Sequence, residues 1–163
     1  MESQQKLSWQ LGELLNRHKL VMTTAESCTG GGVSAAITDI AGSSAWFDRA
    51  FITYSNEAKM EMLGVSAATL EQFGAVSEQT VIEMVEGAIN NSNANIGVSI
   101  SGIAGPGGGS ELKPVGTVCF AWADSFGWQK VETTCFAGGR GQVRQQAVEH
   151  ALKVLYAELL IRN

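Results

Sequence analysis

The chain has 163 residues, a mass of 17.3 kDa and a net charge of −5, and hydrophobic residues make up 45% of it. This is the size of one ordinary domain, so we expect residues 1–163 to form a single domain, and the charged fraction of 17% argues against intrinsic disorder. The acidic balance disfavours nucleic-acid binding, and no apolar run reaches the roughly 18 residues of a membrane span.

Cysteine usage indicates a reducing compartment. Cys28, Cys119 and Cys135 are odd in number and lack CxxC spacing, which argues against both a disulfide framework and a zinc site. The polar N-terminal segment lacks the apolar stretch of a signal peptide. We therefore expect a cytoplasmic protein that holds no metal ion.

Hydrophobic periodicity predicts helices that alternate with strands. Apolar residues three or four positions apart indicate helices, short apolar and β-branched runs indicate strands, and Ser66 and Ser77 are candidate helix N-caps. The first predicted elements, in chain order, are a helix over 4–18, a strand over 20–25, a helix over 31–40, a strand over 49–54 and a helix over 56–63. They are followed by helices over 66–74 and 77–91, strands over 95–101, 116–123 and 128–136, and a helix over 141–161.

This order of elements predicts an α/β fold, a three-layer α/β/α sandwich. The first three strands are joined through helices and should be parallel, because a parallel return needs a crossover. A hairpin signal at residues 124–127 makes the fourth strand antiparallel and the fifth parallel again. The turns after strands one, two, three and five then meet at one edge of the sheet, where ligands bind in open α/β sheets.

Glycine is enriched at this same edge. The chain has 19 glycines, where average usage of about 7% would give roughly 11. They cluster in Gly30–Gly32, Gly102–Gly109 and Gly138–Gly141, all in the turns that converge. Because glycine lets the backbone approach a ligand closely, these clusters point to a binding site.

Ser27 is a candidate nucleophile, because it follows a strand at the start of a helix. There the unpaired N–H groups of Cys28, Thr29 or Gly30 could stabilise a developing oxyanion. Both histidines lie in predicted terminal helices, which disfavours a Ser–His triad. The other interpretation of Ser27 is a helix N-cap.

Lys59 is the candidate base, one crossover after the serine, since Ser–Lys pairs are a known variant of triad logic. The pKa of an unperturbed lysine is about 10.4, whereas a useful general base needs a pKa of about 7–8. Burial and a neighbouring cation can lower the lysine pKa by this amount. The other interpretation is a solvated helix residue. Cys28 is the alternative nucleophile, because a helix N-terminus lowers a thiol pKa, although buried structural cysteine is common.

Arg140 and Arg144 lie one helical turn apart at the glycine-flanked start of the last helix. Two guanidinium groups near a helix N-terminus can form a binding site for a phosphate group. Two exposed arginines on a helix face are the other interpretation. The glycine run after Gly102 has no Walker lysine, so alone it is only a weak indication of phosphate or substrate contact.

Four motifs occur in order: Thr24–Gly31 (TAESCTGG), Thr53–Lys59 (TYSNEAK), Ser101–Pro106 (SGIAGP) and Lys113–Val118 (KPVGTV). Together they resemble the nicotinamide-nucleotide amidohydrolases, also called NMN deamidases, which correspond to the C-terminal domain of competence-damage-inducible protein A. The resemblance covers nearly the whole chain and looks like the stand-alone form of that domain.

The resemblance implies a mixed, mostly parallel five-stranded sheet in the order 2-1-3-4-5, with strand four antiparallel. It implies hydrolysis of nicotinamide mononucleotide (NMN) to nicotinate mononucleotide and ammonia, without a cofactor, in pyridine nucleotide salvage. By the same resemblance Ser27 matches the nucleophile, Lys59 the base and Tyr54 an assistant. We expect these substrate-binding residues: Asn56, Ser101, Gly102, Ile103, Ala104, Gly105, Arg140 and Arg144.

Two alternatives to this function stay open. One is a nucleotide-binding module of the same fold that is catalytically silent, and the other is an amidase that depends on Cys28. For partners, we expect a nucleotide substrate and a homodimer, because domains of this size often form symmetric dimers, and we expect neither nucleic acid nor a membrane.

Overall fold

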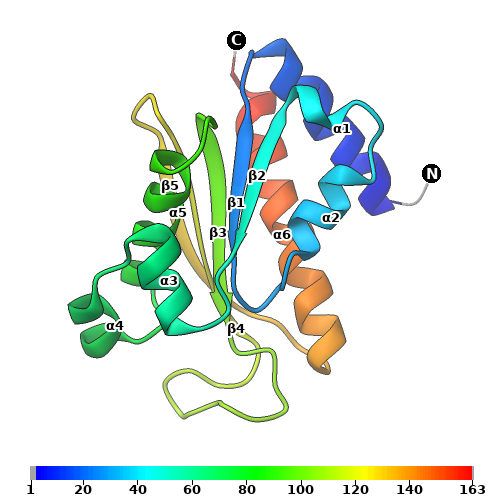
Figure 1. Cartoon of the computed structure of the whole chain (residues 1–163). Helices are drawn as coiled ribbons and strands as arrows, with labels where there is room; N and C mark the ends of the chain where they lie inside the picture. The colour runs from blue at the N-terminus through cyan, green and yellow to red at the C-terminus, as the bar shows by residue number, and fades with distance from the viewer. Residues whose placement is uncertain (1–2, 163) are drawn as a thin grey trace.

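The computed structural model describes residues 3–162, and helices alternate with strands along them as the sequence predicts (Figure 1). The elements are α1 (Ser3–Arg17), β1 (Met22–Glu26), α2 (Gly32–Thr38), the short 3-10 helix η1 (Ser43–Ala45), β2 (Phe47–Ile52), α3 (Asn56–Leu63), α4 (Ala67–Phe73), α5 (Glu78–Asn90), β3 (Ile96–Gly102), β4 (Thr117–Asp124), β5 (Gln129–Cys135) and α6 (Arg140–Leu160).

The five strands form one mixed sheet in the order β2-β1-β3-β4-β5. β1 pairs in parallel with β2 and β3, whereas β4 is antiparallel to both of its neighbours, β3 and β5. The predicted strand order and directions are confirmed. The carboxyl ends of β1, β2, β3 and β5 therefore lie at one edge of the sheet.

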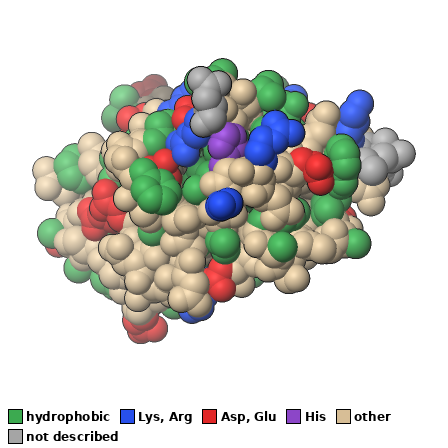
Figure 2. Space-filling view, turned by 90° about the horizontal axis from the view of Figure 1, so that it is seen from above, with side chains coloured by type: hydrophobic (Ala, Val, Ile, Leu, Met, Phe, Trp, Pro, Cys, Tyr) green, Lys and Arg blue, Asp and Glu red, His purple; other side chains and the backbone are tan. Residues whose placement is uncertain are grey.

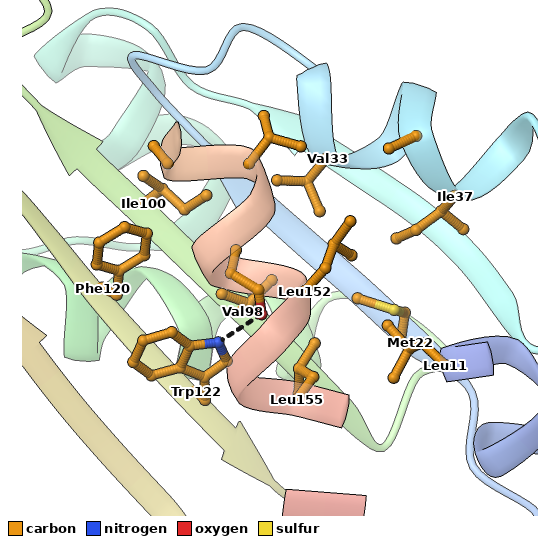
Figure 3. Close-up of a cluster of buried hydrophobic side chains, with 14 of the residues drawn as sticks. Leu11, Met22, Val33, Ile37, Val98, Ile100, Phe120, Trp122, Leu152 and Leu155 are labelled. Carbon is orange, nitrogen blue, oxygen red and sulfur yellow. Dashed lines mark hydrogen bonds between the residues drawn. The ribbon is translucent and has the colours of Figure 1, made fainter. Parts of the chain in front are cut away.

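Helices cover both faces of this sheet and give two hydrophobic cores. α1, α2 and α6 pack over one face and α3, α4 and α5 over the other (Figure 1). Figure 3 shows the first core, in which Trp122 of β4 stacks on Phe120 and donates its indole N–H to the carbonyl of Ala151 in α6. This bond satisfies the one polar atom of a fully buried indole and fixes α6 against the sheet.

Serine caps set the starts of three helices on the second face. Ser66 and Ser77 accept backbone N–H bonds at the starts of α4 and α5, as predicted. Ser55 does the same for α3 through the N–H of Ala58. This cap fixes where α3 begins, and therefore which side chains of its first two turns reach the sheet edge.

Several boundaries differ from prediction by one or two residues; β1 spans 22–26 rather than 20–25, and α2 spans 32–38 rather than 31–40. β2 was expected over residues 49–54, but it spans Phe47–Ile52, because the chain leaves the sheet after Thr53 pairs with Glu26 and then caps α3. α1 ends at Arg17, so His18 follows the helix, and Lys19 takes a positive φ of 57°. The η1 turn was not predicted.

The end of the molecule opposite the residue 103–116 loop has no single charge character. In Figure 2, which looks onto that end, basic and acidic side chains are interspersed with hydrophobic ones. No helix within residues 3–162 has the length and apolar character needed to cross a bilayer. The carboxyl edge of the sheet, at the other end, carries the chemistry described next.

Candidate active site

A cavity of about 260 Å³ lies at the carboxyl edge, where the turns after β1, β2 and β3 meet the start of α6. It is lined by Ser27, Cys28, Tyr54, Asn56, Lys59, Ala75, Val76, Ser101, Gly102, Ala104 and Arg140. A larger hollow of about 370 Å³ between β5 and the end of α6 has no hydroxyl or thiol side chain in its lining. Of these two spaces, the smaller one has a potential nucleophile, and it holds Ser27 together with Lys59.

Ser27 and Lys59 meet in this cavity. The Lys59 Nζ lies 3.0 Å from Ser27 Oγ, 2.9 Å from the carbonyl oxygen of Thr53 and 3.3 Å from that of Tyr54. Ser55 caps α3, and from there the Lys59 side chain reaches back to the two carbonyls that follow the end of β2. Sequence reasoning had proposed this pair, and the structure brings its two reactive atoms within hydrogen-bond distance.

The surroundings of Lys59 favour its neutral amine. The side chain is only 1% exposed, and burial lowers the pKa of Lys59, an effect that the neighbouring Cys28 partly opposes. Within residues 3–162 no carboxylate forms a salt bridge with it. A neutral amine has two N–H donors for the two carbonyls and one lone pair left for the Ser27 hydroxyl.

The two non-catalytic interpretations of this pair do not fit the structure. The N-cap of α2 is Gly31, not Ser27, and the Ser27 hydroxyl instead faces Lys59 and, at 3.4 Å, the carbonyl of Tyr54. Lys59 is buried rather than solvated. Both side chains thus occupy positions that local helix formation does not explain.

Cys28 is a poor candidate nucleophile in this setting. Burial raises the pKa of the Cys28 thiol to about 11. The backbone N–H of Cys28 and the charge of Arg144 lower this pKa, but their effect is smaller than that of burial. At neutral pH the group is therefore a thiol and not the reactive thiolate. The helix N-terminal location that suggested a lowered pKa is not found, because α2 begins at Gly32 with Gly31 as its N-cap and Cys28 lies in the turn before it.

The turn after Ser27 offers N–H groups to an oxyanion. The N–H of Gly30 donates to the carbonyl of Ser27 at 3.0 Å and is already used. In the described part of the chain the N–H groups of Cys28 and Thr29 donate to no carbonyl or side-chain oxygen. Of the three residues expected from sequence to supply donors, Cys28 lines the cavity, with its N–H also beside its own thiol, whereas Thr29 and Gly30 do not line it. The Thr29 N–H has no protein acceptor within residues 3–162.

The two arginines have different environments. Arg140 lines the cavity, donates to the carbonyl of Gly105 at 2.9 Å and contacts the Tyr54 hydroxyl at 3.3 Å. The Tyr54 ring is 64% exposed. Arg144 does not line the cavity, because its guanidinium bonds the carbonyls of Cys28 and Thr29.

The other expected substrate-binding residues also fall into two groups, those that line the cavity and those that do not. Asn56, Ser101, Gly102 and Ala104 line the cavity, whereas Ile103 and Gly105 do not. Ser101 is 1% exposed and lies in the cavity lining. Its hydroxyl is therefore a polar group beside the ligand space.

Sequence reasoning missed Ala75 and Val76, which line the cavity from the segment between α4 and α5. They are small apolar residues without a motif, so only tertiary packing reveals them. Lys113 ties the residue 103–116 loop to the same region by donating to the carbonyl of Phe73 at 2.9 Å. The cavity is therefore bounded by two segments that contact each other.

The fold and site define a class: an α/β protein with a buried Ser–Lys pair at the carboxyl edge of a mixed sheet. The family model described as the CinA C-terminal domain matches residues 4–159, and this chain belongs to that family. The motifs had indicated the same family.

Named relatives and solved structures are similar over nearly the whole chain. The nicotinamide-nucleotide amidohydrolase PncC of Escherichia coli (strain K12) is 56% identical over 155 residues, covering 95% of this chain and 94% of that protein. PncC of Pseudomonas putida is 50% identical over 148 residues, covering 90% of this chain and 91% of that protein. The crystal structure of competence/damage inducible protein CihA from Agrobacterium tumefaciens has a TM-score of 0.93 at 44% identity, covering 96% of each chain.

Proposed function

We propose that this chain is an amidohydrolase that converts NMN to nicotinate mononucleotide and ammonia, with Ser27 as nucleophile and Lys59 as base. The observation that carries the proposal is the 3.0 Å contact between a buried lysine amine and a serine hydroxyl, in a cavity that the guanidinium of Arg140 also lines. The names of the PncC relatives support the substrate.

The first half of the reaction acylates the serine. Neutral Lys59 takes the proton of the Ser27 hydroxyl while Oγ attacks the carboxamide carbon. The carbonyl oxygen becomes an oxyanion, and the N–H groups of Cys28 and Thr29 stabilise it. The tetrahedral intermediate collapses, the C–N bond breaks, and the departing amide nitrogen takes a proton from Lys59 and leaves as ammonia.

The second half releases the acid. Water attacks the nicotinoyl ester, Lys59 accepts a proton from that water, and collapse of the second intermediate returns a proton to Ser27 Oγ. The exposed hydroxyl of Tyr54, beside Arg140, can assist proton transfer at the mouth of the cavity. No step requires a cofactor.

Substrate recognition uses the rest of the lining. Arg140 binds the 5′-phosphate, because a chain with a net charge of −5 needs a local positive charge to attract an anion. Ser101 and Asn56 hydrogen-bond the polar groups of the substrate, and the Gly102–Gly109 loop borders the pyridine and ribose. The carbonyl of Gly105 keeps the Arg140 side chain in place.

Several wider properties belong to the same proposal. The activity acts in pyridine nucleotide salvage, in the cytoplasm, and residues 1–163 form one amidohydrolase domain. The protein acts as a homodimer on a small nucleotide, with neither nucleic acid nor a membrane as partner. Free thiols at Cys28, Cys119 and Cys135 support a reducing compartment.

Ammonia and nicotinate mononucleotide, measured after incubation with NMN, test the proposal. We expect the two products in equal amounts. A catalytically silent module would bind NMN in calorimetry and release no ammonia, which would overturn the proposed activity. An amidase that depends on Cys28 would lose activity on Cys28→Ala, whereas we expect that variant to stay active.

A further inference from the structure

Glu26 is a buried carboxylate that the mechanism above does not use. It is fully buried at the end of β1, next to Ser27. Oε1 accepts hydrogen bonds from the Thr29 hydroxyl (2.8 Å) and the Val33 N–H (2.9 Å), and Oε2 accepts from the Ser34 N–H (3.0 Å). The Thr24 hydroxyl gives Oε2 a fourth donor.

These bonds tie the nucleophile turn to the first turn of α2. The N-cap of α2, Gly31, has no side chain to accept N–H groups, and Glu26 accepts those of Val33 and Ser34 instead. The Thr29 hydroxyl brings the middle of the turn to the same carboxylate. Glu26 thus takes hydrogen-bond donors from the middle of the turn after Ser27 and from the start of α2.

Arg144 of α6 donates hydrogen bonds to two carbonyl oxygens of the same turn. Its Nε donates to the carbonyl of Cys28 at 2.9 Å and its Nη2 to that of Thr29 at 3.3 Å. Neither Glu26 nor Arg144 lines the cavity, whereas Arg140, one helical turn away, does. The contacts of Arg144 are therefore with the turn and not with the ligand space.

Peptide geometry links these contacts to the oxyanion donors. In a planar trans peptide the N–H points opposite to the C=O, so a fixed Cys28 carbonyl also fixes the direction of the Thr29 N–H. The Ser27 N–H is anchored separately by the carbonyl of Ile100 at 3.0 Å. The N–H groups of Cys28 and Thr29 then project from a turn that is fixed at both ends.

We propose that Glu26 and Arg144 are positioning residues that orient the peptide planes after Ser27, and thereby the N–H groups that stabilise the oxyanion. The inference rests on the proposed function, because it assigns the support of that same nucleophile turn. It also separates the two arginines, since Arg140 binds the phosphate and Arg144 shapes the catalytic turn.

The test uses Glu26→Gln, which replaces one acceptor oxygen with a donor NH₂, and Arg144→Lys, which keeps the charge but loses the planar pair of donors. We expect kcat for NMN to fall about 100-fold or more in each, as when an oxyanion donor is lost. The Kd for nicotinate mononucleotide, measured by calorimetry, should stay within about twofold of wild type because the ligand contacts remain. Gln145→Ala, an exposed change beside Arg144, is the matched control and should leave both quantities unchanged.

A substrate-independent readout keeps this inference separate from the proposed function. Phenylmethylsulfonyl fluoride should label Ser27: Oγ forms a bond to sulfur, the S–F bond breaks, fluoride leaves and Lys59 takes the hydroxyl proton. Intact-mass spectrometry of folded protein should show labelling at least about tenfold slower in both variants, because the sulfonyl oxygens use the same N–H donors.

The outcomes are distinct. If wild type releases no ammonia but is labelled, and both variants are labelled slowly, the positioning role stands and the proposed substrate is wrong. If the variants keep wild-type kcat and labelling rates, the positioning role is wrong. If Arg144→Lys instead weakens product binding in proportion to its loss of activity, Arg144 is a substrate ligand and the inference is overturned.

Discussion

Lys59 loses the hydration that a lysine on a helix surface would keep, and its burial is the reason that it can act as a base. Protonated Lys59 cannot accept the Ser27 proton, so kcat/KM should fall about tenfold per pH unit below the lowered pKa of Lys59 and level off above it. The midpoint of this limb should lie below the ordinary value of 10.5.

A pH profile of ammonia release measures this midpoint. Cys28→Ala is the control and should retain it, since the thiol pKa of about 11 would place a thiolate-dependent limb higher. A midpoint at or above 10.5 would contradict the assignment of Lys59 as the base.

Arg140 supplies the cavity's cation, so its loss should affect binding first. Arg140→Ala removes charge-assisted hydrogen bonds worth about 1.5–3 kcal/mol, and KM for NMN should rise about 10- to 100-fold. Lys153→Ala is the matched control, because it removes one positive charge from the same helix at a surface pair with Glu149. Equal KM values in the two variants would show that the phosphate is bound elsewhere.

At the scale of elements, contact between α3 and α5 holds the helix that carries Lys59. A Cβ at Gly87 of α5 would overlap the carbonyl of Leu63, the last residue of α3. We expect Gly87→Ala to lower the free energy of unfolding by about 1–3 kcal/mol, with activity reduced because α3 shifts.

Urea unfolding of this variant should be compared with that of Gly141→Ala. Gly141 lies in α6 with open space at its Cβ position, so alanine should be neutral there or stabilise by about 0.5–1 kcal/mol. A Gly87→Ala variant as stable as Gly141→Ala would contradict the close packing of α3 on α5.

Sequence signals that act within a few residues predicted many elements, whereas boundaries that depend on long-range pairing were predicted less well. The caps Ser66 and Ser77 and the turn at residues 124–127 act within a few residues, and the sequence located them. The end of β2 depends on which residues pair with β1, a long-range matter, and its predicted bounds were displaced by two residues. Helix and strand order was therefore easier to predict than strand bounds.

The candidate site shows the same division. Ser27 and Lys59 could be paired from sequence because strand direction alone brings their turns to one edge. The separate environments of Arg140 and Arg144 could not, because they depend on where each guanidinium lies relative to a turn more than 100 positions earlier. Periodicity places residues on a helix face, and only packing decides their partners.

At the scale of the whole molecule, two cores share one sheet, so we expect them to unfold together. The chain has 4 tryptophans; Trp46, Trp122 and Trp128 belong to or pack against the core under α1, α2 and α6, and Trp9 lies on α1. Tryptophan fluorescence therefore reports that face, whereas far-UV circular dichroism reports all helices.

Urea transitions followed by the two signals should coincide if residues 1–163 form a single cooperative domain. Midpoints that differ beyond error would indicate that the α3–α5 face unfolds separately, and would contradict the single-domain expectation.

The most direct test of the central claim compares ammonia release from NMN by wild type, Ser27→Ala, Lys59→Met and Cys28→Ala, each with folding checked by circular dichroism. We predict that Ser27→Ala and Lys59→Met lose activity by about 10⁴-fold or more while Cys28→Ala stays active. Substantial activity in folded Ser27→Ala, or its loss in folded Cys28→Ala, would contradict a mechanism based on the Ser27–Lys59 pair.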